Sequence, residues 1–330
     1  MCSISRPFSI RGLSTKIVTR ALTTPFRALW LRQRGAATAD VSDLIDPEVL
    51  QREISEVLGT PLGAVRETWA AEAVQLGSVV LRDARQFGIT PHQYDAAMER
   101  LYREGAGFVY ETLCYWRTPD RMDWSTRGLQ RVLRHARAAG VAPGQLRVLV
   151  LGDGAGTDTL FLARHGIRPT YFDVPGSVTW MFARDRFARR RVAVEIVDDY
   201  ASLLHAEYDV VWCYDAVEHL PDLPTGLREI GLMVKPGGIL LLTESCIFVR
   251  DDLPTHLEVN RHYGPRIPGW LRENGLHAVW LQRLTGLRPV EYRKLRWWDA
   301  AGRVRSWSTA RRLERELARI SGAGGNPATG

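Results

Sequence analysis

Short apolar runs alternate with helical stretches from about residue 146 onward, and this alternation constrains the fold more than any other feature. Three of the runs, 147–151, 209–213 and 239–243, are mostly apolar, which is typical of strands covered on both faces. Strands joined through helices form parallel sheets. The pattern predicts an α/β fold with a doubly wound sheet. The expected strands are 147–151, 170–172, 193–197, 209–213, 239–243, 279–284 and 291–295, and the last two lie close enough in sequence to form an antiparallel edge.

A glycine-rich loop follows the first expected strand. Gly152, Gly154 and Gly156 separate the apolar run from a helical stretch. Glycine permits tight turns and close approach of a ligand to the main chain, and ligands of open α/β sheets bind at the carboxyl ends of strands. A plain strand-to-helix connection would also use such glycines. The dinucleotide pattern G-x-G-x-x-G needs glycine at the position of Thr157, so the loop argues against a nicotinamide cofactor.

Carboxylates end the next two expected strands. Asp173 lies about 20 residues after the start of the loop, where a carboxylate can accept hydrogen bonds from both hydroxyls of a ribose. It could instead be a turn residue before Pro175. Asp198 and Asp199 end the third strand, and either could contact an adenine amino group or lie in a solvated loop. For the adenine contact, we favour Asp199 slightly over Asp198.

Positive charge is concentrated at the start of the chain. Residues 1–39 carry seven of the 44 basic residues and no acidic one, so the remaining 291 residues have no net charge. A neutral body argues against nucleic acid as a partner. Ile10, Leu13 and Ile17 recur at helical spacing, which leaves three interpretations of residues 1–40: a flexible leader, an amphipathic arm in contact with anionic lipid, and an organellar transit peptide.

Four widely spaced cysteines form neither a CxxC pair nor a Cys/His cluster, which predicts reduced thiols and no metal site. No apolar stretch is long enough to span a bilayer. We therefore expect a cytoplasmic protein, with peripheral membrane contact through residues 1–39 as an option.

Residues 41–140 have helical periodicity. The sequence predicts helices that start at Asp46 and Pro47, near 64–86, near 91–115 with Thr90 as N-cap, and over 125–139. Four aromatic residues near the end of this segment either line an acceptor pocket or belong to the core. They are Phe108, Tyr110, Tyr115 and Trp116.

The region 146–297 resembles the class I S-adenosylmethionine-dependent methyltransferases. The resemblance rests on the stretch 149–156, on Phe172 and Asp173, on Asp-Ala-Val-Glu-His-Leu at 215–220, and on Lys-Pro-Gly-Gly at 235–238. It implies a seven-stranded Rossmann-like sheet whose last strand is antiparallel, and S-adenosylmethionine as cofactor. We expect a leader at 1–40, a helical cap at 41–140, the cofactor-binding methyltransferase domain at 141–298, and a basic helical tail with a disordered end at 299–330.

The resemblance also implies roles for individual residues. Gly152, Gly154 and Gly156 would pass the methionyl part of the cofactor, Asp173 would hold the ribose, and Asp199 or Asp198 would approach the adenine. Tyr214, Asp215 and Ala216 would line the cofactor at the end of the fourth strand. The family often has an acidic residue at the position of Val150, and Asp153 inside the loop is a candidate to replace it.

A hydroxyl acceptor benefits from a general base, for which histidine is suited. His219, His256 and His262 are the candidates, although His219 could instead have a structural role. Asn260 and Tyr263 add polar groups to the same segment. We expect an O-methyltransferase that acts on a small or medium acceptor, such as a glycan precursor or a secondary metabolite. The alternatives are a nicotinamide oxidoreductase and, because of Val150, a weak or inactive methyltransferase-like binding or scaffold protein.

Overall fold

The structure is a computed structural model that describes residues 41–281, 289–296 and 299–323. The chain divides into residues 1–40 and residues 41–330. The predicted leader therefore lies outside the described residues, as does the end of the predicted tail. No helix in the described part of the chain is both long and apolar enough to cross a membrane.

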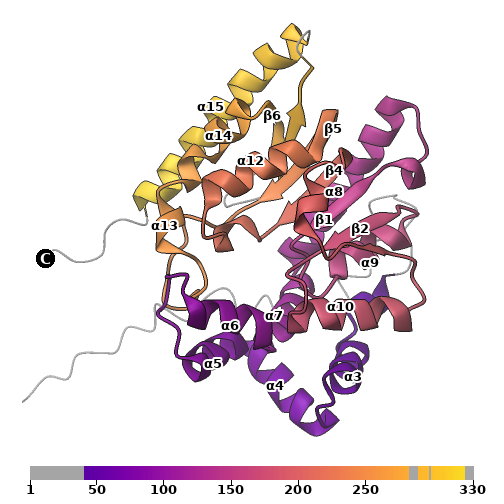
Figure 1. Cartoon of the computed structure of the whole chain (residues 1–330), viewed down its shortest axis with the longest axis vertical. Helices are drawn as coiled ribbons and strands as arrows, with labels where there is room; N and C mark the ends of the chain where they lie inside the picture. The colour runs from indigo at the N-terminus through magenta and orange to yellow at the C-terminus, as the bar shows by residue number, and fades with distance from the viewer. Residues whose placement is uncertain (1–40, 282–288, 297–298, 324–330) are drawn as a thin grey trace, which may run out of the picture. The chain divides into compact units, whose positions relative to one another are not determined.

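A seven-stranded sheet forms the centre of the second unit (Figure 1). Its strand order is β3-β2-β1-β4-β5-β7-β6, and β7 runs antiparallel to both of its neighbours. The predicted α/β, doubly wound, seven-stranded fold is confirmed. The strands are β1 Val148–Leu151, β2 Pro169–Phe172, β3 Glu195–Ile196, β4 Tyr208–Tyr214, β5 Val234–Thr243, β6 Leu276–Leu281 and β7 Val290–Lys294.

The chain winds outward from β1 toward β3 and then returns to β4 on the other side of β1. The carboxyl ends of β1 and β4 therefore mark the topological switch point, where a crevice opens in sheets of this kind. The predicted antiparallel pairing of the last two strands is present, and β7 lies between β5 and β6.

Helices surround the sheet and precede it. They are α3 Pro47–Leu58, α4 Leu62–Val74, α5 Ser78–Phe87, α6 Ala96–Glu104, α7 Gly107–Trp116, α8 Pro119–Ala139, α9 Thr157–Arg164, α10 Val178–Arg189, α11 Tyr200–Leu203, α12 Leu223–Met233, α13 Glu258–Arg261, α14 Ile267–Glu273 and α15 Ala300–Ala323. Short 3₁₀ helices are η1 Ser42–Leu44, η2 Pro143–Gln145, η3 Val217–His219 and η4 Gly264–Arg266.

Side chains that cap helices explain where the helical segment departs from prediction. The stretch near 64–86 is two helices, because the Glu72 carboxylate accepts hydrogen bonds from the amides of Gly77 and Val79 and so satisfies the start of α5. Thr90 is not the N-cap of α6; Asp95 caps it, accepting from the amide of Met98 at 2.9 Å. The predicted start of α3 is correct, with Asp46 as N-cap.

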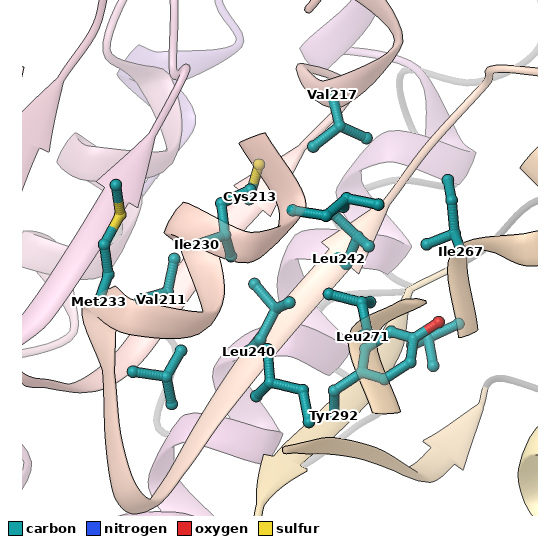
Figure 2. Packing of buried hydrophobic residues seen from close by; sticks show 14 of the residues in the cluster. Val211, Cys213, Val217, Ile230, Met233, Leu240, Leu242, Ile267, Leu271 and Tyr292 are labelled. Carbon is teal, nitrogen blue, oxygen red and sulfur yellow. The ribbon is translucent and has the colours of Figure 1, made fainter. Parts of the chain in front are cut away.

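Both faces of the sheet are buried at its central strand, β4. Val211 and Cys213 of β4 belong to a cluster that includes residues of α12, α14 and α15, part of which is drawn in Figure 2. The next side chains along β4, Trp212 and Tyr214, face α8. At Gly128 of α8 a Cβ would lie 2.4 Å from Trp212, so only glycine allows this close packing.

Ion pairs join the first helices to the rest of the unit. Glu53 of α3 pairs with Arg186 of α10 and with Arg190, which follows the end of that helix. Helix α8 instead covers the sheet, where Arg131 pairs with Glu291 of β7. The boundary expected at 140–141 stays a prediction, and the structure places α8 against the strands that follow it.

Candidate functional site

The glycine loop after β1 lies at the switch point. Gly152, Gly154 and Gly156 all have positive φ, between 54° and 74°. A Cβ on Gly152 would lie 2.6 Å from Cβ of Ala216, and one on Gly156 would lie 2.5 Å from the ring of Phe187. The loop therefore needs glycine for its conformation and for its packing.

Asp173 fixes the middle of this loop. Its carboxylate accepts hydrogen bonds from the amides of Gly154 at 2.6 Å and Val174 at 2.7 Å. The hydroxyl of Tyr171 donates to the carbonyl oxygen of Gly154 at 2.7 Å. A carboxylate has about four acceptor sites, so Asp173 keeps capacity for further donors. Burial raises the pKa of Asp173, and the two amides oppose that rise.

The other acidic residues predicted for the cofactor lie in different surroundings. Asp153 caps α9, where it accepts from the amides of Asp158 at 3.0 Å and Thr159 at 2.7 Å. Asp199 is exposed and caps α11 through the amide of Ala201 at 3.0 Å. Asp198 beside it is exposed. Both capping roles are ones that a carboxylate takes at a helix start.

Tyr214 is the last residue of β4, and Asp215 follows it. The Tyr214 ring packs against α8, and its buried hydroxyl has no hydrogen-bond partner among the described residues. Asp215 has a φ of 53°, rare for a residue with a side chain. Its Oδ1 accepts from the hydroxyl of Thr243, whereas its buried Oδ2 has no hydrogen-bond partner in the described structure.

A buried network that the sequence analysis did not identify lies behind this loop. Asp158 accepts hydrogen bonds from Arg121 at 2.5 Å and from the indole nitrogens of Trp116 at 2.8 Å and Trp212 at 3.0 Å. The guanidinium of Arg121 also lies 3.7 Å from Asp215. Burial alone would lower the pKa of Arg121, but these two carboxylates raise it above its usual range. Because the partners come from α7, α8, α9 and β4, no local sequence pattern indicates the network.

Three carboxylates gather at the ends of β4 and β5. Asp215, Glu218 and Glu244 interact with one another, and burial is the main cause of their raised pKa values. The pKa of Glu244 rises to about 7. Glu218 is 1% exposed, and its Oε2 has no hydrogen-bond partner in the described part of the chain.

Two of the three predicted histidines lie beside Glu218. The rings of His219 and His256 are 5.1 Å apart between centroids and almost perpendicular. Nδ1 of His219 lies 3.0 Å from the carbonyl oxygen of Thr255 and 2.9 Å from the hydroxyl of Tyr102. Nδ1 of His256 lies 2.8 Å from the carbonyl oxygen of Phe248. Burial lowers the pKa of both rings, that of His256 to about 3.

The remaining polar residues of this segment have other surroundings. His262 is exposed and stacks on Tyr263, with ring centroids 3.9 Å apart. Asn260 is buried and donates to the carbonyl oxygens of Glu218 at 3.1 Å and Leu220 at 2.7 Å. Asn260 therefore ties α13 to η3, the turn that carries Glu218 and His219.

The predicted aromatic residues of α7 divide between core and site. Tyr110 and Trp116 are buried in the core. Phe108 stacks on Tyr102, with centroids 5.1 Å apart, and Tyr102 in turn contacts His219. Tyr115 lies close enough to Asp215 for the carboxylate to raise its pKa further, after burial.

The residues at this edge fit a nucleoside cofactor with a cationic end. Asp173 has free acceptor capacity beside the loop, as a ribose requires. Oδ2 of Asp215 lies 3.7 Å from Arg121 but accepts no hydrogen bond in the described structure, so it offers an acceptor for an ammonium group. Val150 is buried in β1 and offers no carboxylate, whereas Asp153 within the loop and Asp173 at the end of β2 do.

Comparison with known proteins identifies similar sequences and folds. A family model described as a methyltransferase domain matches residues 124–320. A ubiquinone biosynthesis O-methyltransferase from Aeromonas salmonicida is 31% identical over 100 residues, 29% of this chain and 42% of that protein. One from Escherichia fergusonii is 33% identical over 95 residues, 28% of this chain and 40% of that protein. The matches thus span about two fifths of these curated relatives.

The fold also has a counterpart among solved structures. The CurJ carbon methyltransferase superposes with a TM-score of 0.50 at 15% identity, covering 76% of this chain and 72% of that one. At this identity the likeness concerns the fold alone.

Proposed function

The chain belongs to the family of methyltransferase domains, and on this premise we propose that it transfers a methyl group from S-adenosylmethionine to a hydroxyl of a small or medium-sized acceptor. The observation that carries the proposal is the hydrogen bond from the Gly154 amide to Asp173. It places a carboxylate beside the glycine loop at the switch point, where a ribose would be held.

Cofactor binding would use three groups of this chain. Asp173 accepts from the ribose hydroxyls, the backbone of the glycine loop lies along the methionyl part, and Asp215 receives the ammonium. Asp199 and Asp198 remain candidates for the adenine. When bound, S-adenosylmethionine supplies a sulfonium methyl group with an activated leaving group. The protein then needs mainly to align the acceptor.

The acceptor would approach along Tyr102 and His219. Tyr94, Tyr102 and Phe108 stack in sequence, with centroids 6.3 and 5.1 Å apart. Aromatic faces suit a sugar ring or an aromatic ring. A glycan precursor or a secondary metabolite is compatible with this surface, and the names of the two curated relatives favour transfer to oxygen.

The hydroxyl proton would leave toward His219. His256 is not the proposed base, since burial and the neighbouring His219 lower its pKa to about 3. His262 lies outside the pair and has no role in this proposal. The histidines predicted from the sequence thus separate into a candidate base, its neighbour and a surface residue.

The test is methyl transfer with S-adenosylmethionine labelled in its methyl group. The protein is incubated with small-molecule fractions, beginning with glycan precursors and phenols, and the label in extracted products is counted. We expect acceptor-dependent label with the wild type and a loss of at least about tenfold with Asp173→Ala. Cofactor binding without transfer to any fraction would favour the alternative, a methyltransferase-like binding or scaffold protein.

A further inference from the structure

We propose that Glu218, His219 and His256 bind a divalent metal ion of the Zn²⁺ class. The first two residues lie on η3 after β4, and His256 lies in the segment after β5. Each offers one donor atom, and the three atoms lie within 4.8 Å of one another. The absence of close Cys and His spacing predicted no metal site, but the fold brings together residues that are 37 positions apart in the sequence.

Backbone carbonyls fix both imidazole rings in the form that binds metals. A carbonyl oxygen only accepts, so Nδ1 of His219 donates to Thr255 and Nδ1 of His256 donates to Phe248. In the neutral ring the lone pair is then on Nε2. Metal-binding histidines usually donate their second ring nitrogen in this way, which sets ring orientation.

Glu218 supplies the third donor. Its Oε2 is buried without a hydrogen-bond partner among the described residues, which costs free energy unless something compensates it. The carboxyl groups of Asp215 and Glu244 lie close to it. Arg121 is the cation that faces Asp215. A divalent ion between Glu218 and the two rings would give Oε2 the partner that it lacks in the described structure.

The donor set indicates the class of ion. Two imidazoles and one carboxylate suit Zn²⁺ and similar transition metals, whereas Mg²⁺ prefers oxygen ligands. Donors at about 2.1 Å from a tetrahedral ion lie about 3.4 Å apart. Small side-chain rotations would bring the three donors to that separation. The fourth position would then be open to a water molecule or an acceptor hydroxyl.

The role of the ion deepens the proposed function and rests on it. An acceptor hydroxyl at the open position would lose its proton more readily, because a bound cation lowers its pKa. The proton would pass to water. The oxygen lone pair would form the new C–O bond while the C–S bond breaks with both electrons on sulfur, which yields the methyl ether and a neutral thioether. His219 would then act as a ligand rather than as the base.

Metal binding is tested without cofactor or acceptor, so its result is separate from methyl transfer. The full chain is stripped with a chelator and dialysed against Zn²⁺ or Mg²⁺, and bound metal is counted. Co²⁺ serves as a second probe, since four-coordinate Co²⁺ absorbs strongly in the visible range. We expect about one Zn²⁺ per chain, a four-coordinate Co²⁺ spectrum that Zn²⁺ abolishes, and weaker Mg²⁺ retention.

Variants locate the ion. Glu218→Gln and His256→Ala should each weaken Zn²⁺ binding by about 100-fold or more, because losing a ligand costs at least as much as losing its hydrogen-bond partner. His262→Ala, which removes an exposed histidine nearby, should bind Zn²⁺ like the wild type. Circular dichroism establishes that each variant is folded, and the wild-type Co²⁺ spectrum stands independently of the variants.

Other results would contradict the metal site, the role of the ion or the proposed function. No stoichiometric Zn²⁺ on the folded wild type, or equal loss of Zn²⁺ in His262→Ala and His256→Ala, would overturn the metal site. Methyl transfer that persists in the stripped protein without Zn²⁺ would return His219 to the role of base. Zn²⁺ binding without any methyl transfer would retain the site and reject the proposed function.

Discussion

Arg121 donates to the buried carboxylate of Asp158 at 2.5 Å, and this pair joins α8 to the helix that follows the glycine loop. Asp158 is 1% exposed and also holds two indole nitrogens. Removing one partner of a buried ion pair leaves the other charge uncompensated, which is far more costly than losing a surface pair.

Asp158→Asn should therefore lower the free energy of unfolding by about 3 kcal/mol or more. Urea denaturation followed by tryptophan fluorescence measures it. Asp185→Asn is the matched control, because Asp185 pairs with Arg189 on the exposed side of α10. It should leave the urea midpoint unchanged. Equal effects of the two substitutions would contradict a stabilising role for the buried pair.

Alanine substitution at two glycines with similar φ distinguishes the effect of backbone conformation on stability from the effect of packing. Gly156 and Gly166 have φ of 74° and 77°. A Cβ on Gly156 would lie 2.5 Å from Phe187, whereas one on Gly166 would meet no described residue within 4 Å. Gly166→Ala should lower the free energy of unfolding by about 1 kcal/mol, because alanine disfavours this positive φ. Gly156→Ala should lower it by about 2 kcal/mol more than Gly166→Ala does, because the added methyl group overpacks the site. Denaturation midpoints compare them, and identical midpoints would refute the packing argument.

Glu111 should make stability depend on pH. Burial, with Glu72 and Asp215 nearby, raises its pKa from 4.5 to about 8. The folded state therefore binds the proton more tightly than the unfolded state, and this contribution to stability is lost as pH rises from about 4.5 to 8. Glu111→Gln should become more stable relative to the wild type across that range, as thermal melts at stepped pH would measure. Glu67→Gln, on the exposed surface of α4, is the control, and parallel curves for all three proteins would contradict the assignment.

Asn260 should be important for holding η3 in place. Asn260→Ala removes one buried and one partly buried hydrogen bond to carbonyl groups, which should lower the free energy of unfolding by about 2 kcal/mol. Asn274→Ala removes one bond to Trp270 in a partly buried place and should cost less. Hydrogen exchange of the η3 amides provides the local readout. Unchanged protection in Asn260→Ala would mean that η3 is held by other contacts.

The strands of the sheet could be predicted because neighbouring residues in the sequence specify each of them. Each strand is a short apolar run, and the glycine loop and Asp173 lie at strand ends that a parallel sheet must bring together. Helix boundaries were harder to predict where a side chain binds backbone amides and so starts a new helix, as Glu72 does at α5.

The site was only partly predictable, since its contacts join distant segments. His219 and His256 were identified as separate candidates, but their pairing around Glu218 depends on how the segment after β5 folds back over η3. Arg121 stands in a helix with no distinguishing local pattern, and its partners lie on α9 and at the end of β4. Histidine next to glutamate in the 215–220 motif was the signal that could have indicated Glu218.

Calorimetric titration with S-adenosylmethionine and, separately, with NADH tests the central claim most directly. We predict micromolar binding of S-adenosylmethionine, no binding of NADH, and affinity that is at least about tenfold weaker in Asp173→Ala but unchanged in Asp185→Asn. Absence of S-adenosylmethionine binding to the folded wild type, or wild-type affinity in Asp173→Ala, would contradict the account.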